Sequence, residues 1–296
     1  MSPDRGVSTV LDVVACLLLV TAAVGVHVAA PSSGQQIRGE RTAASVADVL
    51  TTSTAAVDYS VQPSVTSEAA PTYPEASETA YRRSAHGTLG ELLAAAAVAE
   101  TRVDGHRVVP HDEFPERVVA ATSEQLAVVD AGVRVVARWE PFPESSVNGT
   151  VAVGPRPPPD ADVTAATTAV SVTTGCTNEA ADLAARKNGF DRLPGLFADC
   201  VVQTLFPPAD TRVALRGQPP ASTLAVHRYR LAADAFNASI TSTPSPEEVS
   251  AVNTRLQNRL STALEADVRK HYDDPIAAAG AASPGRVTIT VRTWDR

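Results

Sequence analysis

The amino-terminal segment constrains this chain more than any other feature of the sequence. It reads MSPDRGVSTVLDVVACLLLVTAAVGVHVAAPSS, and no Asp, Glu, Lys or Arg occurs from Val13 to Ile37. The strongly apolar part runs from Val13 to Ala30. A membrane-spanning helix needs ~20 mostly apolar residues. The run is long enough once Val7 to Leu11 are included, which places Asp12 near one end.

Three interpretations of this segment lead to three different mature proteins. A secretory signal peptide would be cut after Ala30, although Pro31 disfavours that site and the apolar run is long for such a signal. A plain anchor helix would stay uncut. A filament-type signal would be cut within Arg5-Gly6-Val7, after Gly6, and would leave the apolar helix on a chain that begins at Val7.

Several stretches carry a resemblance to a known family. Asp4 to Ser8, the apolar run and the later sequence VADVLTTSTAAVDYSV resemble those of a haloarchaeal pilin-like membrane protein family, which is associated with archaeal type IV pilus and secretion machinery. The site after Arg5-Gly6 resembles that of archaeal prepilin peptidases. Asp12 resembles the acidic residue early in many pilin helices, but here it is the sixth residue after the cut, whereas the fifth is usual in bacterial pilins.

The resemblance implies a non-catalytic cell-envelope protein with one amino-terminal helix and an external α+β domain. It implies that membrane lipid surrounds the helix, and that the helix contacts other pilin-like subunits or secretion-machine components. Residues 1–36 are then the signal or anchor, and residues 37–296 the domain outside the cell, with residues 60–86 as a candidate linker rich in Ser, Thr, Pro and Glu. The protein would be a single-pass membrane protein.

Charge and composition narrow the function classes. The formal net charge is −8, which argues against nucleic acid as a partner, because sequence-independent binding requires a basic face. Lysine occurs only at Lys187 and Lys270, a bias typical of salt-loving archaea and of GC-rich genomes. Aromatic residues make up only 4% of the chain, so the core is expected to consist mainly of Val, Ala and Leu.

Hydrophobic periodicity predicts an α+β fold with a small antiparallel sheet and several helices. Helices are expected at 37–54, 88–103, 112–132, 222–239 and 245–272, and strands at 55–61, 132–142, 149–154, 163–175 and 286–294. The last strand is expected to join the main sheet. Residues 277–285 are expected to form a loop of small residues.

The helix at 245–272 has the clearest pattern in the chain. Ser245 is expected to cap it, with Pro246 at the first helical position. Its apolar residues recur on one face at helical spacing: Val249, Val252, Leu256, Leu260, Leu264 and Val268.

Two cysteines and two sequons favour an exported domain. Cys176 and Cys200 predict a disulfide, which would stabilise the fold by about 3.5 kcal/mol in the chain-entropy model, with two buried free thiols as the alternative. Asn148 and Asn237 begin glycosylation triplets. Asn148 is expected in an exposed turn and Asn237 after a helix.

Few residues suggest a catalytic site or a metal-binding site. His106, His111, Asp112 and Glu113 form one polar cluster, which is either a metal site or, as we favour, a polar loop in which Asp112 caps a helix. The sequence contains no Gly-x-Ser-x-Gly motif, no Gly-rich phosphate loop and no zinc-type spacing. We therefore expect no catalytic residue, no metal and no cofactor.

Two hypotheses of different classes follow. The first is a pilin-like subunit or accessory component of an archaeal type IV filament or secretion system. The second is a membrane-anchored extracellular enzyme or solute-binding domain. A deep polar pocket containing His106, His111 and Glu113 would favour the second hypothesis.

Overall fold

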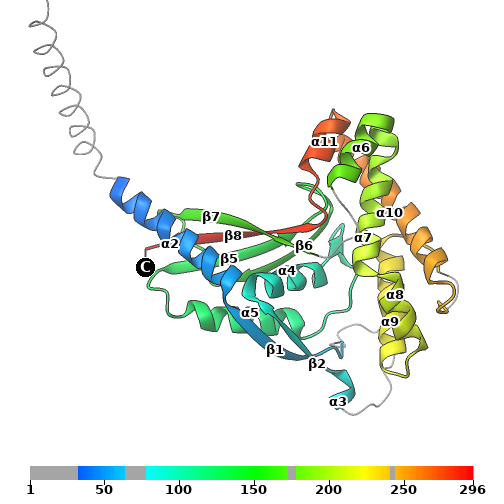
Figure 1. Ribbon diagram of the computed structural model, residues 1–296, viewed down its shortest axis with the longest axis horizontal. Helices are drawn as coiled ribbons and strands as arrows, with labels where there is room; N and C mark the ends of the chain where they lie inside the picture. The colour runs from blue at the N-terminus through cyan, green and yellow to red at the C-terminus, as the bar shows by residue number, and fades with distance from the viewer. Residues whose placement is uncertain (1–32, 64–77, 173–177, 241–243, 296) are drawn as a thin grey trace, which may run out of the picture.

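The computed structural model describes residues 33–63, 78–172, 178–240 and 244–295 as a mixed α+β fold (Figure 1). In chain order its elements are α2 (Ser33–Thr52), β1 (Thr54–Ser60), α3 (Glu78–Tyr81), β2 (Arg82–Thr88), α4 (Leu89–Ala99), β3 (Arg102–Val103), β4 (His106–Arg107), α5 (Phe114–Leu126), β5 (Gly132–Trp139), β6 (Val147–Val153), β7 (Thr164–Ser171), α6 (Asn178–Asn188), the short 3-10 helix η1 (Gly189–Asp191), α7 (Leu193–Leu205), α8 (Pro208–Arg216), α9 (Ala221–Ala235), α10 (Val249–His271), α11 (Pro275–Ala281) and β8 (Arg286–Trp294).

The main sheet has six antiparallel strands in the order β4-β3-β6-β5-β8-β7. Strand β8, the last of the chain, lies between β5 and β7, which confirms that the carboxyl-terminal strand joins the main sheet. Strands β1 and β2 form a separate antiparallel pair.

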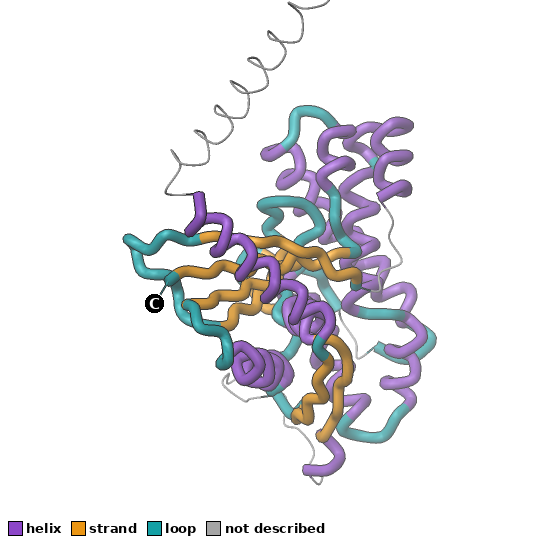
Figure 2. Tube along the Cα trace, turned by 60° about the vertical axis from the view of Figure 1, so that its left-hand side comes forward, coloured by secondary structure: helices purple, strands orange, loops and turns teal. Residues whose placement is uncertain are grey.

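The two faces of the main sheet have different surroundings, as the period-two alternation of β8 shows. Val287, Ile289 and Val291 are buried, whereas Arg286, Thr288 and Arg292 are exposed. Helix α2 lies along β7 and β8, and α4 packs against the middle of the sheet (Figure 2). The helices therefore cover the apolar face and leave the polar face to solvent.

Helices α6 to α11 form a second layer beyond one end of the sheet, in which α7 and α10 pack side by side (Figure 1). All six apolar residues expected on one face of α10 are buried, so that prediction is confirmed. The helix begins at Val249 and not at Pro246, because residues 246–248 form a turn in which Glu248 accepts a hydrogen bond from the Ser245 backbone N–H at 3.0 Å.

Aromatic and polar contacts join the two layers into one continuous core. The Phe142 ring, just after β5, lies 5.5 Å from the Phe197 ring of α7 and 6.2 Å from that of Tyr272. The Asp267 carboxylate of α10 accepts a hydrogen bond from the Ser146 backbone N–H at 2.7 Å. The sheet and the helical layer are thus packed against each other through buried side chains.

Several elements differ from the sequence-based expectations. Residues 277–285 are not all loop, because α11 covers 275–281 and the Asp274 side chain caps it by accepting from Ile276 and Ala277. Within the candidate linker 60–86, residues 78–81 form α3 and residues 82–86 belong to strand β2, so this end of the stretch is folded.

Candidate functional site

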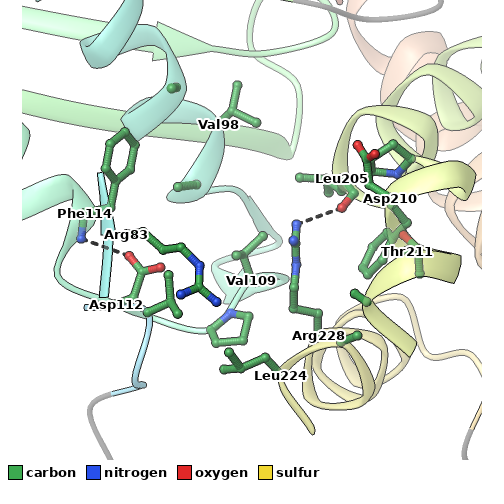
Figure 3. A pocket seen from close by; sticks show the side chains of 18 of the residues that line it. Arg83, Val98, Val109, Asp112, Phe114, Leu205, Asp210, Thr211, Leu224 and Arg228 are labelled. Carbon is green, nitrogen blue, oxygen red and sulfur yellow. Dashed lines mark hydrogen bonds between the residues drawn. The ribbon is translucent and has the colours of Figure 1, made fainter. Parts of the chain in front are cut away.

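A cavity of about 480 Å³ lies between the two layers. Its walls come from the β1–β2 pair, α4, the segment 109–114 and helices α7, α8 and α9 (Figure 3). Most lining side chains are apolar, among them Val98, Val109, Leu205 and Leu224. The polar side chains that line it are Tyr59, Arg83, Asp112, Thr204, Asp210, Thr211 and Arg228.

Arg228 reaches the cavity from α9 and is the most buried charge in it. Its Nη2 donates to the Leu205 carbonyl at 2.7 Å, near the carboxyl end of α7, where a cation is favoured by the helix dipole. Its Nε atom is buried and has no hydrogen-bond partner among the described residues. Burial lowers the pKa of the Arg228 guanidinium, and nearby Asp112 acts in the opposite direction.

Asp112 lies on the opposite wall, in the segment that enters α5. Its Oδ1 accepts a hydrogen bond at 3.0 Å from the backbone N–H of Phe114, the first residue of α5. The N-cap position is Glu113 and no side chain caps this helix, so the prediction that Asp112 caps it was wrong. Burial raises the pKa of the Asp112 carboxyl, opposed by the Phe114 N–H, His111 and Arg228. Burial, together with Asp112, also raises the pKa of the Tyr59 phenol, whose ring packs 4.8 Å from that of Phe114.

A buried network fixes the floor of the cavity. The Phe206 ring stacks on Tyr229 at 4.7 Å, and the Arg228 guanidinium carbon lies 5.7 Å from the Phe206 ring centre. The Tyr229 hydroxyl donates to Asn253 Oδ1 at 2.7 Å, and Asn253 donates to the Phe206 carbonyl at 2.9 Å. Burial raises the pKa of Tyr229 to about 12, so this hydroxyl stays protonated and able to donate.

The cluster expected around His111 is only partly assembled. His111 lies between two carboxylates, with Nε2 3.0 Å from Glu116 and Nδ1 3.4 Å from Glu100. Glu113 instead pairs with Arg117 at 3.3 Å, and His106 is exposed in β4. Within the described parts of the chain, no three His, Cys, Asp or Glu side chains are placed to hold a metal ion.

Part of the predicted processing and membrane segment cannot be compared with the structure. Arg5, Gly6 and Val7 lie outside the described residues, as does the apolar run. Of the helices that are described, none has the length and apolar character needed to cross a membrane.

Cys200 is buried in α7 and is disulfide-bonded. Cys176 lies outside the described residues, so the pairing of the two cysteines stays a prediction.

The two sequons lie in different environments. Asn148 is half-buried in strand β6, not in an exposed turn, and its side-chain amide donates to the Ser145 carbonyl at 3.1 Å. Asn237 is exposed just after α9, with φ of 52°. The left-handed conformation is one that Asn tolerates at a helix end. The geometry therefore favours Asn237 as the accessible acceptor.

Sequence reasoning singled out neither Arg83 nor Arg228 as cavity residues. A signal for Arg228 exists, because Ala221, Leu224 and Ala225 of α9 line the cavity at helical spacing and Arg228 continues the same stripe. An arginine on an otherwise apolar helix face is unusual enough to mark it.

Comparisons with known proteins give a family but no activity. A model for a family of unknown function, DUF7284, matches residues 11–294. No curated protein and no solved structure matches the chain. The family match spans nearly the whole sequence, from within the amino-terminal apolar run to the end of β8. The chain therefore belongs to the DUF7284 family.

Proposed function

We propose that the protein is a non-catalytic, pilin-like component of the cell envelope, held in the membrane by its amino-terminal segment with the α+β domain outside the cell. The observation that carries this proposal is the position of α2. This helix follows the apolar run within a few residues and packs along β7 and β8 of the main sheet.

The contacts of α2 suit a helix that joins an anchor to a domain. Ala43, Val46, Ala47 and Leu50 are buried against the domain. Near the amino end of the helix, a Cβ on Gly39 would lie 2.7 Å from Thr164 of β7, so the helix backbone approaches the sheet closely there. An anchor that continues into α2 would thus be fixed to the main sheet and not to a free tail.

The alternative is an anchored extracellular enzyme or solute-binding domain. A deep polar pocket containing His106, His111 and Glu113 would favour this alternative. His111 and Glu113 border one open hollow near residues 60–63, but His106 does not. The solute-binding version is supported by the mainly apolar cavity that Arg228 lines, and the two roles are compatible in one chain.

The mature amino terminus tests the proposal directly. Mass spectrometry of membrane and medium fractions from the source cells should find a membrane chain that begins at Val7. A G6V variant should remain uncut, whereas A30L, changed at the alternative signal-peptide site, should be processed like the parent. A chain beginning near Pro31 and recovered from the medium would contradict both the anchor and the filament role.

A further inference from the structure

We propose that the cavity between the two layers binds a small organic monocarboxylate with an apolar body, and that Arg228 receives the carboxylate. This inference is independent of how the amino terminus is processed. It rests on the charge of Arg228, on the balance of the other charges around the cavity and on the apolar walls.

The first step is that the Arg228 guanidinium is half-buried, with its Nε atom fully buried, and forms no ion pair with a carboxylate among the described residues. Among the described residues, the guanidinium hydrogen-bonds to the Leu205 carbonyl and lies over the Phe206 ring, both uncharged. Asp112 influences it electrostatically but lies across the cavity, as Figure 3 shows. A buried charge is costly unless it is paired, so an anion entering the cavity would relieve an existing cost.

The second step is that Arg228 has an N–H group that donates no hydrogen bond to any described residue. Nη2 is engaged by Leu205, but the buried Nε–H has no partner in the part of the chain described. A guanidinium presents its N–H groups in a planar fork that matches a carboxylate. The Arg228 guanidinium, which lines the cavity, is therefore the expected point of contact for the carboxylate.

The third step sets the ligand's charge. Two arginines, Arg83 and Arg228, and two aspartates, Asp112 and Asp210, line the cavity, together with the Tyr59 phenol. The formal charges cancel, and a monoanion would match the single charge of Arg228, whereas a dianion such as a phosphate monoester would bring a second charge at a larger desolvation cost. Arg83 is exposed and hydrogen-bonds to backbone carbonyls of Ala80 and Arg82, which leaves Arg228 as the deep cation.

The fourth step concerns the size and the apolar character of the rest of the ligand. Val98 of α4 lies across the cavity from Leu224 of α9 (Figure 3), and Ala99 and Phe206 also line it. The volume of about 480 Å³ falls within the roughly 300–1,000 Å³ typical of small-molecule sites, which are mainly apolar with a few polar groups that fix orientation. A short branched or aromatic hydrocarbon body fits this lining.

Calorimetry on the full-length chain in detergent micelles, with empty micelles as reference, tests the proposal. The probes are 3-phenylpropanoate, its neutral isostere 3-phenylpropanamide and the cation 3-phenylpropylamine. We expect saturable binding of one carboxylate per chain, with the amide weaker by about tenfold or more, as expected for loss of a charge-assisted hydrogen bond.

Variants locate the binding site. R228M should weaken 3-phenylpropanoate binding by roughly tenfold or more. Arg230 is an exposed residue two positions further along α9, and the variant R230M should bind 3-phenylpropanoate as the parent does. Because R228M also removes the contact to α7, A95L provides a second test. Ala95 lines the cavity but is exposed on α4, so a leucine there should reduce binding without unfolding the protein.

Three outcomes would overturn the proposal. The first is equal binding of the carboxylate and the amide. The second is no saturable binding of the carboxylate at millimolar concentration. The third is unchanged carboxylate binding in folded R228M or A95L protein.

Discussion

At the scale of single residues, Gly149 shows that the close approach of a neighbouring backbone can require glycine at one position. It lies in β6, and a Cβ built on it would collide with the Ala97 carbonyl at the end of α4. We expect Gly149→Ala to lower the free energy of unfolding by about 3 kcal/mol, because backbone groups cannot move aside as a flexible side chain can. Chemical denaturation followed by circular dichroism measures the change.

A matched glycine elsewhere provides the control for this prediction. Gly280 is exposed in helix α11, and a Cβ there meets nothing within 4 Å. Gly280→Ala should leave stability unchanged or raise it by up to about 1 kcal/mol, since alanine favours helix. Equal effects of the two substitutions would show that the approach of α4 to β6 is not as close as described.

Gly149 also explains why the prediction of an exposed turn at Asn148 was wrong. Asn-Gly is a strong turn signal, so an exposed turn was the reasonable prediction. The glycine is instead required by the packing of α4, a helix that lies about fifty positions earlier in the chain. Local sequence carries no information about such a contact.

At the scale of elements, α4 has a complete capping box at its amino end. The Glu91 backbone N–H donates to the Thr88 hydroxyl at 3.1 Å, and the Glu91 carboxylate accepts from the Thr88 backbone N–H at 2.8 Å. We expect Thr88→Ala to destabilise the fold by about 1 kcal/mol, the usual cost of losing such a cap. Thr88→Ser, which keeps the hydroxyl, should recover most of the loss in the same unfolding measurement.

This cap also predicts a pH dependence. The hydrogen bonds from the Thr88 backbone N–H and hydroxyl lower the pKa of Glu91 in the folded chain. A lowered folded-state pKa means that the stabilisation is complete above the unfolded-state value, and is lost as the pH falls through the folded-state value.

Unfolding free energies of the parent and of Glu91→Gln, measured from neutral to acidic pH, test this dependence. The difference between the two should shrink as the pH falls below about 4.5, the ordinary pKa of the side chain. A difference that stays constant down to the acid limit would show that the ionised form of Glu91 is not the one that caps α4.

Elements with strong local signals were predictable, and those held by tertiary contacts were not. Helix α10 was predicted because its apolar residues repeat on one face. Strand β2, RRSAHGT, has one β-branched residue and no apolar alternation, and it is a strand because it pairs with β1. Helix α11 begins with Asp274 as its cap and Pro275 at its first position, a start signal that sequence reasoning missed, whereas its packing against α6 could not be seen in the sequence.

At the scale of the whole molecule, the cavity was beyond prediction from the sequence. Its lining residues come from two stretches, 59–114 and 204–228, and strands β5, β6 and β7 of the main sheet lie between them in the sequence. The sequence identified α4, α5 and α9 as helices, but not that α4 and α9 face each other across a gap. Only the packing of the helical layer against the sheet layer creates the site.

The continuous core predicts that the two layers unfold together. Both tryptophans, Trp139 and Trp294, lie in strands of the main sheet, so their fluorescence reports on the sheet layer. Leu264 is fully buried in α10 of the helical layer. Leu264→Ala should lower the free energy of unfolding by about 2–5 kcal/mol through the cavity that it leaves.

Because the layers share a core through Phe142, this substitution should shift the tryptophan transition and the helical circular dichroism transition to the same lower midpoint. Arg259→Ala, on the exposed face of the same helix, should move neither midpoint appreciably. Loss of helical signal in Leu264→Ala at a denaturant concentration that leaves tryptophan fluorescence unchanged would show instead that the layers are separate folding units. The cavity would then lie at a joint that opens independently of the sheet.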